Sequence, residues 1–213
     1  MRAATVALVL CSACSADRAV SDPPTSVRER LERGETSLAI LPAESAGAVA
    51  AARRVAGQWN VGLADLAIRD GAVGLSAEPS GAITLERLAI ALDPIAIPDS
   101  LLGYDVQLTD VELALADPVR FATAWDGDDD GHGDAAVALE LSWSLTNHGS
   151  TSPLGAPELP PVPIALDVTG NGSLIRAELR VLAPGELWSW ADLVRLEDLS
   201  LILSATEHST MDP

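Results

Sequence analysis

Cysteine and the smaller aromatic residues are almost missing from this chain of 213 residues, which has two Cys, one Phe and one Tyr. Both cysteines, Cys11 and Cys14, lie close to the N-terminus. The remainder of the chain therefore has no disulfide framework and no cysteine-rich metal site. The hydrophobic fraction of 48% comes mainly from Ala, Leu and Val, with five tryptophans beside them. We expect an aliphatic core in one β-rich domain, for which the length is sufficient.

Basic residues are scarce, with 13 against 31 acidic ones and a net charge of −18. No basic cluster exceeds a pair such as Arg53-Arg54. A nucleic-acid backbone would be repelled by this balance, which excludes nucleic acid as a partner. The acids are spread among apolar stretches, and this favours a charged, solvated face over an acidic disordered tail.

Recognisable enzyme motifs are also missing: the chain has no GxSxG, HExxH, GxxxxGK[ST] or GxGxxG. Carboxylate pairs such as Asp105 with Asp110, or Glu197 with Asp198, could act as acid and base only if a cleft brought them together. We therefore predict that the protein is not an enzyme. After the N-terminal segment, no run approaches the roughly twenty apolar residues that a membrane span needs.

The first sixteen residues, MRAATVALVLCSACSA, have a charged start at Arg2, an apolar run and then small residues. This is the layout of a secretory signal, too short to span a membrane. Residues 10–14 resemble a bacterial lipobox, although the family usually has Leu where this chain has Cys11. The resemblance implies a signal peptide over 1–13 and a lipidated Cys14 as the mature N-terminus. A plain secretory signal and a chance apolar start are the alternatives.

Lipid on Cys14 would hold the protein on a membrane, since each buried methylene contributes about 0.8 kcal/mol. Cleavage before Cys14 removes Arg2 and no acid, so the mature charge becomes 12 − 31 = −19. Residues 14–25 form a flexible tether in this interpretation. Ser15 follows the cysteine, and the absence of Asp there favours, by analogy with lipoprotein sorting, an outer-membrane or cell-surface location.

A short helical segment over 26–58 is expected to follow the tether. Ser26 and Glu29 match a capping box, and Gly34 is placed to end a helix over 27–33. The Ala-rich stretch 42–58 is a second helix candidate. From Trp59 the hydrophobic period changes to two, which predicts a β domain over 59–207 and a tail over 208–213.

One template recurs in the β domain, in which an apolar residue lies three before the next and the apolar residues then alternate. Copies start at 63, 85, 108, 174 and 196, which gives a period of about 22 residues. The offset of three predicts a bulge or bend, since one extra residue moves the following side chains to the other face. We predict a mostly β fold of antiparallel hairpins in a meander or sandwich; a parallel solenoid, or chance matches, are the alternatives.

These amphipathic strands faintly resemble those of the AsmA-like bacterial envelope lipid-transfer proteins, without a diagnostic residue from which an activity could be carried over. Residues 150–163 contain five prolines and cannot form a central strand. We expect them to connect one half of the β domain to the other. A Pro-rich recognition ligand is the alternative.

Five aspartates lie within nine residues in the stretch WDGDDDGHGD. Counted from Asp126, acids occupy positions 1, 3, 5 and 9, glycine occupies position 6, and His132 could offer its backbone carbonyl at position 7. This DxDxDGxxD pattern resembles the calcium loops of thrombospondin type 3 repeats and EF-hands, and implies calcium as a cofactor. The ligands would be those that follow: Asp126, Asp128, Asp130, His132 and Asp134.

The loop departs from an EF-hand because Val137 stands where the bidentate Glu is needed and because alternating stretches replace the flanking helices. Calcium binding should therefore be weak, with a Kd of about 10⁻⁴ to 10⁻³ M. A hydrated acidic hairpin tip is the alternative. A transition-metal site through the ring of His132 would need a second histidine or a cysteine nearby.

Three functions remain open. The first is a lipid-anchored bacterial envelope protein that acts as a non-catalytic structural or interaction module. The second is an envelope protein that binds an apolar ligand or lipid in a groove between bulged strands. The third is a calcium-dependent hydrolase or a carbohydrate binder that uses Trp188 and Trp190. A filled core would favour the first, and an unfilled apolar groove the second.

Overall fold

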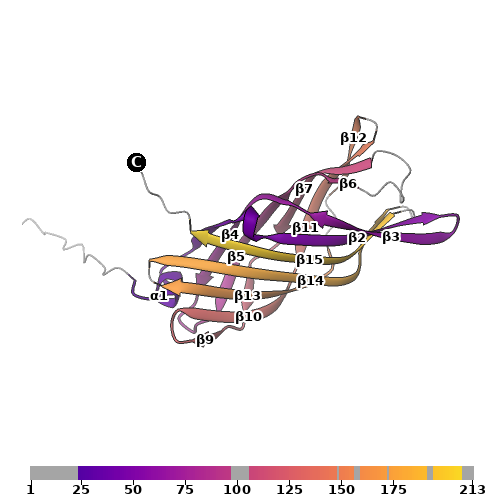
Figure 1. The fold of residues 1–213 in the computed structure, drawn as a ribbon. Helices are drawn as coiled ribbons and strands as arrows, with labels where there is room; N and C mark the ends of the chain where they lie inside the picture. The colour runs from indigo at the N-terminus through magenta and orange to yellow at the C-terminus, as the bar shows by residue number, and fades with distance from the viewer. Residues whose placement is uncertain are drawn as a thin grey trace, which may run out of the picture.

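The computed structural model describes residues 24–96, 106–147, 149–155, 159–171, 173–190 and 194–207. The signal peptide, Cys14, most of the tether and the tail from 208 lie outside the described residues. Within them the chain forms one antiparallel sheet of 15 strands and one short α-helix (Figure 1). The prediction of a mostly β, antiparallel fold is confirmed. No described helix has the length and apolar character to cross a membrane.

The elements follow one another in short steps. In chain order they are α1 (Val27–Glu32), β1 (Thr36–Ile40), a 3-10 turn (Pro42–Glu44), β2 (Ala46–Val55), β3 (Gln58–Leu66), β4 (Ile68–Ala77), β5 (Ile83–Leu92), β6 (Ile95–Ala96), β7 (Val106–Leu115), β8 (Val119–Phe121), β9 (Ala124–Asp126), β10 (Asp130–Val137), β11 (Leu139–Asn147), β12 (Ser150–Gly155), β13 (Val162–Asn171), β14 (Leu174–Trp190) and β15 (Val194–Glu207).

The sheet consists of two meandering wings joined at a central seam. The strand order is β12-β11-β7-β5-β4-β1-β15-β14-β13-β10-β9, and the β2–β3 hairpin pairs with β15. At the seam the first strand of the chain pairs with the last, with Leu38 opposite Glu207 and Ile40 opposite Ala205. The first and last strands of the described chain therefore join the two wings into one sheet.

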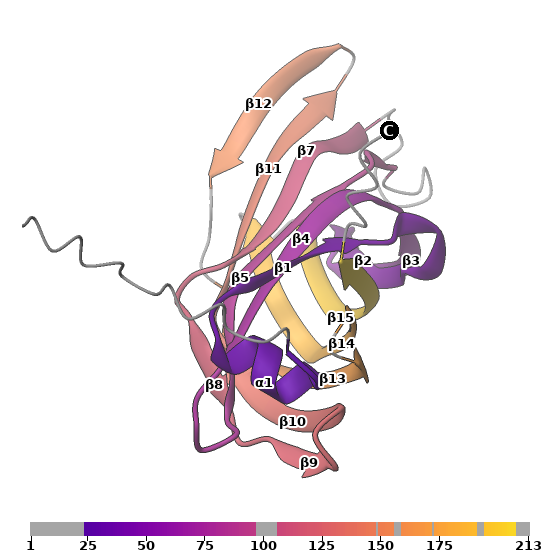
Figure 2. The same ribbon diagram turned by 90° about the vertical axis from the view of Figure 1, so that its left-hand side faces the viewer.

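The sheet curls, so that the inner faces of the two wings enclose the core (Figure 2). Alternate residues of each strand point inward, as in β13, where Val162, Ile164, Leu166 and Val168 are each at most 1% exposed. Helix α1 lies at one end of the curled sheet, with both of its inward-facing apolar side chains buried. No polar or charged residue is buried among those described.

The bulges that the repeat predicts occur in three of its five copies. In the copy at 108, Asp110 and Val111 of β7 together lie opposite Trp143 of β11. The pairing shifts by one residue in the same way at the copies that start at 85 and 196. Each bulge keeps the leucine before it and the apolar residues after it in the core; Leu85 and Leu88, for example, are both at most 1% exposed.

The other two copies have no bulge. The copy at 63 spans the end of β3 and the start of β4, and its first residue, Leu63, is 70% exposed. The copy at 174 pairs with β13 in continuous register. The template therefore marks amphipathic strands in general, and a bulge forms only where both of its apolar sets face the core.

The predicted helix over 42–58 is wrong, and so is the β-domain boundary at Trp59. Only Pro42–Glu44 form a 3-10 turn, after which β2 pairs with β15 on one side and β3 on the other. Alanine favours helices, but its small side chain also fits between two flanking strands, and tertiary pairing overrides the weak preference. The β domain begins at Thr36 with β1. The other helix prediction is confirmed to within one residue.

The Pro-rich segment connects the two wings, as expected. Its first part, β12, lies at the edge of the sheet and, among the described strands, pairs only with β11; the next described strand, β13, belongs to the other wing. Pro153 lacks an N–H, and an edge strand is where that lack is tolerated.

Candidate functional site

The predicted calcium loop is the turn between β9 and β10. Asp126 ends β9, Asp130 begins β10, and these two residues lie directly opposite each other in the register. Gly127, Asp128 and Asp129 form the turn, in which Gly127 has a φ of +70°. The left-handed conformation that reverses the chain therefore falls on Gly127.

Gly131, at position 6 of the pattern, does not make the bend. It lies within β10 opposite Trp125, and a Cβ atom there would be 3.1 Å from the indole ring. A side chain at this position would press on the Trp125 ring, which favours glycine there. The prediction that Gly131 makes the turn of the loop is therefore wrong; Gly127 makes it.

The acids of the pattern are spread along an extended strand. All five predicted ligand residues are exposed, and from Asp130 onward three of them, Asp130, His132 and Asp134, lie on one face of β10. Alternate residues of a strand are about 7 Å apart, so Asp130 and Asp134 are too far from each other to share one ion. No group of three or more His, Cys, Asp or Glu side chains gathers in the described part of the chain. In this conformation the full ligand set does not fit a calcium ion.

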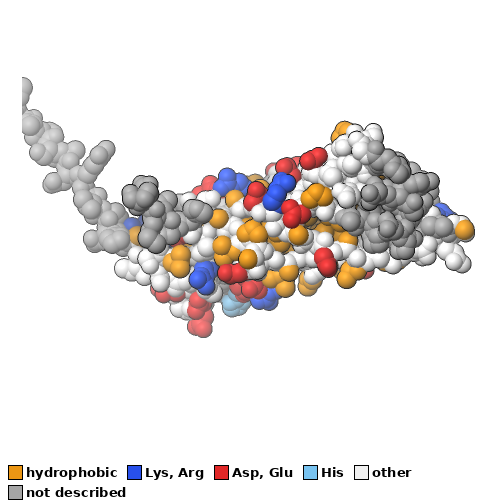
Figure 3. Space-filling model, turned by 45° about the horizontal axis from the view of Figure 1, so that its top comes forward, with side chains coloured by type: hydrophobic (Ala, Val, Ile, Leu, Met, Phe, Trp, Pro, Cys, Tyr) orange, Lys and Arg blue, Asp and Glu red, His pale blue; other side chains and the backbone are white. Residues whose placement is uncertain are grey.

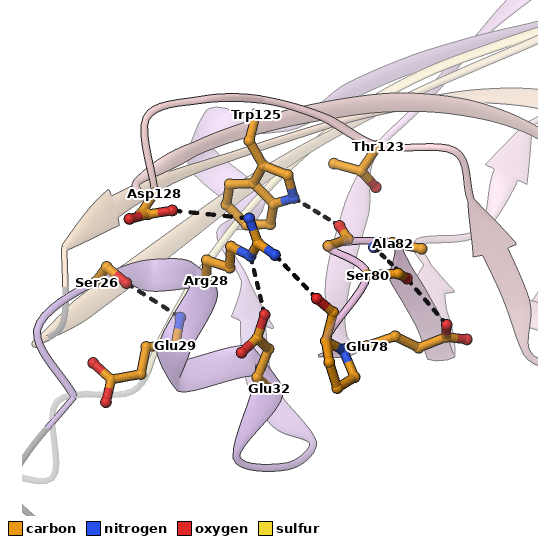
Figure 4. A network of polar contacts seen from close by, with 12 residues as sticks. Ser26, Arg28, Glu29, Glu32, Glu78, Ser80, Ala82, Thr123, Trp125 and Asp128 are labelled. Carbon is orange, nitrogen blue, oxygen red and sulfur yellow. Dashed lines mark hydrogen bonds and ion pairs between the residues drawn. The ribbon is translucent and has the colours of Figure 1, made fainter.

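The turn instead binds the N-terminus of α1 (Figure 4). Asp129 Oδ1 accepts a hydrogen bond of 2.9 Å from the backbone N–H of Val27, and the carbonyl oxygen of Asp128 accepts one of 2.9 Å from the N–H of Arg28. These are two of the N–H groups that a helix leaves unpaired at its start. A carboxylate at this position also interacts favourably with the helix dipole.

Arg28 links the helix to a second turn. Its Nε donates to Glu32 Oε1 at 3.0 Å, its Nη2 donates to the carbonyl of Pro79 at 3.1 Å, and its Nη1 lies 3.9 Å from Asp128 Oδ1. Pro79 belongs to the turn between β4 and β5. Trp125 reaches the same turn, because its Nε1 donates to the carbonyl of Gly81 at 2.6 Å. Helix α1 and turns from both wings thus form one polar network, which we call the α1 clasp.

The helix start carries its own cap. Ser26 Oγ accepts from the N–H of Glu29 at 3.2 Å, as the capping box predicts. Glu29 Oε2 accepts from the backbone N–H of Thr25 at 2.8 Å, one residue earlier than the standard box. This bond, followed by the hydrogen bond from Arg33, lowers the pKa of Glu29 below its usual value.

Asp129 is the residue that sequence reasoning missed. It falls at position 4 of the calcium pattern, where no ligand is expected, and its partner lies 102 residues away in the sequence. A helix that begins at Val27 has N–H groups that need acceptors, and this was the one signal in the sequence. No feature near the helix in the sequence indicated that Asp129 would be the acceptor.

An apolar cleft lies within the core near the β2–β3 end. Trp143, 3% exposed, lines it, and its Nε1 has no acceptor. The free volume is about 30 Å³, far below the roughly 300–1,000 Å³ of typical ligand pockets. The described residues that line the cleft are all apolar: Val49, Leu66, Leu92, Ile95, Val111, Leu113, Leu141, Trp143, Leu159, Leu187, Leu196, Leu199 and Leu201.

Trp188 packs into this region. Its ring meets that of Trp143 edge to face, with ring centroids 4.5 Å apart, and it lies against the core. A tryptophan that stacks on a sugar must expose the face of its ring to solvent. The packing of Trp188 against Trp143 and the core does not favour this role. The side chain of Trp190 lies outside what the structure describes.

Acids outside the turn hold structural partners. Asp198 Oδ1 accepts from the N–H of Gly185 at 2.7 Å, and Glu197 lies 3.1 Å from Arg195 Nε. On the outer face of β13 and β14 Arg180 contacts Glu178 at 2.7 Å and Asp167 at 3.0 Å. The hydrogen bond to Glu178 and then the charge of Asp167 raise the pKa of Arg180. These carboxylates thus make contacts between and along neighbouring strands of the sheet.

Comparison of the chain with protein-family models, curated proteins and solved structures finds no match.

Proposed function

We propose that this protein is a lipid-anchored bacterial envelope protein whose β-rich body acts as a non-catalytic structural or interaction module. The observation that carries the proposal is the filled core. The apolar cleft leaves about 30 Å³, so the curled sheet has side chains where an apolar ligand would have to lie.

The α1 clasp supports the anchoring part of this proposal. Helix α1 is the first element after residues 14–25, and two backbone bonds from the β9–β10 turn fix its start. Arg28 adds the contact with the carbonyl of Pro79. A helix tied to turns from both wings keeps a lipid tether attached to the body at one defined place.

The anchor is tested by replacing the cysteine that would carry it. In a bacterial host we expect wild-type protein to stay in the membrane fraction after a wash at about 1 M salt, because acyl insertion is not screened by ions. Cys14→Ser should release the protein into the soluble fraction of that wash. Mass spectrometry should find the added lipid mass on the wild type and on Cys11→Ser, and not on Cys14→Ser. Lipid mass on Cys14→Ser would contradict the assignment.

A weak calcium site confined to the apex of the hairpin is a separate part of the proposal. It is supported by the direct pairing of Asp126 with Asp130, which holds two carboxylates on one face with Asp128 in the turn between them. Like charges opposite each other across a hairpin are destabilising, and a bound cation would relieve the repulsion.

Thermal melting measures this site. With a Kd of about 1 mM, calcium at about 10 mM should stabilise the fold by about 1.4 kcal/mol, or raise Tm by about 3–5 °C. Asp126→Asn with Asp130→Asn should abolish the calcium effect. Asp134→Asn, on the same strand, should retain it. An identical Tm in calcium and in chelator would remove the calcium site from the proposal.

A second candidate function is the binding of an apolar chain that carries a carbonyl. It is favoured by the buried Trp143 Nε1, which lacks an acceptor in an otherwise apolar cleft. A water there would find too few polar partners. Titration with dodecanoic acid should then change the tryptophan fluorescence of the wild type but not of Trp143→Phe. No change in either protein would eliminate this candidate.

A further inference from the structure

The β2–β3 hairpin differs in charge from the rest of the molecule. Between Glu44 and Asp65 the sequence contains no Asp or Glu, although the chain has 31 of them. The same stretch contains Arg53 and Arg54, the adjacent basic pair that precedes the hairpin turn. The β2–β3 hairpin carries one acid, Asp65 near its base, and therefore has a net charge of +1 in a strongly acidic protein.

The hairpin also presents apolar side chains to solvent. Val61 and Leu63 of β3 are 60% and 70% exposed, the highest values among the exposed large hydrophobic residues of the described chain. Trp59 lies two residues before Val61 and therefore on the same face of the strand. Among the described strands β3 pairs only with β2.

Trp59 is held in place by a cation. The guanidinium carbon of Arg195 lies 3.7 Å from the centroid of the indole ring. Arg195 also contacts Glu186 at 3.2 Å and Glu197 at 3.1 Å. Arg195 therefore pairs with both carboxylates while its guanidinium lies over the Trp59 ring.

The hairpin reaches the end of the molecule opposite α1 (Figure 1). Figure 3 shows hydrophobic side chains between acidic and basic ones over the visible face, whereas the tip at the right carries basic and hydrophobic atoms and no acidic ones. At physiological ionic strength charges are screened over about 8 Å. The excess acid of the body therefore does not cancel the charge of a tip that projects from it.

We propose that the tip of the β2–β3 hairpin docks on a membrane surface that bears phosphate headgroups. Arginine pairs with phosphate, tryptophan favours the headgroup level, and Val61 and Leu63 enter the upper acyl region. The absence of carboxylates matters because each one would be repelled or would lose hydration at the surface. This inference names a partner for the interaction module proposed above, and it requires no lipid on Cys14.

Co-sedimentation with lipid vesicles tests the docking. The full chain with Cys14→Ser is mixed with vesicles of phosphatidylcholine, alone or with phosphatidylglycerol, so that no acyl chain on the protein contributes. Val61→Ser with Leu63→Ser should lower the partition coefficient about tenfold or more. Arg53→Gln and Arg54→Gln should each lower it about fivefold on the anionic vesicles. Binding to the anionic vesicles should also weaken as salt rises.

Matched variants on the same sheet provide the controls. Leu182→Ser with Ile202→Ser removes two other exposed apolar side chains, 58% and 44% exposed, and Arg69→Gln removes an exposed arginine of β4. These variants should bind as the parent does, and circular dichroism should show that every variant is folded. Equal binding by the hairpin variants and the parent would overturn the proposal, as would equal losses in the controls.

Two further results distinguish membrane docking from dimerisation through the hairpin and from anchoring by lipid on Cys14. A concentration-dependent dimer that the hairpin variants lose, without vesicle binding, would identify β3 as a contact between copies of the chain and would overturn the membrane assignment. The anchor is judged by the lipid mass on Cys14, which the vesicle experiment does not involve. Either proposal can therefore fail while the other stands.

Discussion

At the scale of single residues, aspartate adopts the left-handed backbone conformation in two of the three bulges. Asp110 and Asp198 occupy the same place in the copies at 108 and 196, and both have a φ of +52°. Asp tolerates this left-handed conformation because its short polar side chain bonds locally. The side chain of Asp198 is also fixed from the neighbouring strand, because it accepts a hydrogen bond from the N–H of Gly185.

Replacement of Asp110 separates backbone strain from side-chain contacts. Asp110→Val should lower the free energy of unfolding by about 1–2 kcal/mol, because a β-branched residue is strained at positive φ. Asp110→Gly should change it by only a few tenths of a kcal/mol or raise it slightly. Denaturant unfolding provides the measurement, and equal stabilities for the Val and Gly variants would refute the argument from φ.

At the scale of elements, α1 is too short to be stable by itself. A six-residue helix lies well below the roughly 12–15 residues at which isolated helices become marginal in water. Its stability comes from the burial of Val27 and Leu31 and from the α1 clasp. The β9–β10 turn thus has a structural task that does not depend on whether it also binds calcium.

Removal of the cap from the turn should loosen the helix. Asp129→Ala should lower the free energy of unfolding by about 1 kcal/mol, the usual cost of a lost N-cap. Amide exchange of α1 should rise while that of the seam strands stays slow. Asp134→Ala, an exposed residue of β10, serves as the control and should leave exchange in α1 as it is.

The docking of α1 should also weaken in acid. The pKa of Glu29 is lowered in the folded state, first by the hydrogen bond from the N–H of Thr25. Its contribution is therefore fully present above the unfolded value of about 4.3 and is lost as pH falls through the lower folded value. The stability difference between wild type and Glu29→Gln should shrink over that acid range. A difference that stays constant there would count against the bond; Glu35→Gln is the matched control.

At the scale of the whole molecule, the seam between β1 and β15 makes the two wings one unit. The first and last strands pair with each other, and each continues into a different wing. If each wing were a separate sheet, the two wings could unfold one after the other. Because β1 and β15 pair at the centre of a single sheet, we expect the two wings to unfold cooperatively.

Neighbouring residues on the two faces of β15 test this seam. Leu203→Ala, at a fully buried position, should cost about 2–5 kcal/mol. Ile202→Ala, at a position 44% exposed, should cost less than half as much as Leu203→Ala. Far-ultraviolet dichroism and tryptophan fluorescence should report one coincident transition in both variants. Separate transitions for the two probes would mean that the wings unfold independently.

Patterns between near neighbours in the chain were readable from the sequence. The two-residue period predicted strands, the offset of three predicted the bulges at 85, 108 and 196, and the Ser26 cap predicted α1. The five prolines predicted a connector between the wings. Each of these depends on geometry within about ten residues, which composition and spacing determine directly.

The tertiary structure decided everything that depends on a distant partner. It made 46–55 a strand because β15 and β3 flank it, and it left Leu63 exposed because that face of β3 points away from the core. It also placed Asp129, rather than the spaced aspartates, at the N-terminus of α1. The contacts of β2 with β15 and of Asp129 with Val27 join residues more than a hundred positions apart. Sequence spacing carries no information about them, because they exist only once the sheet has curled and its first and last strands have met.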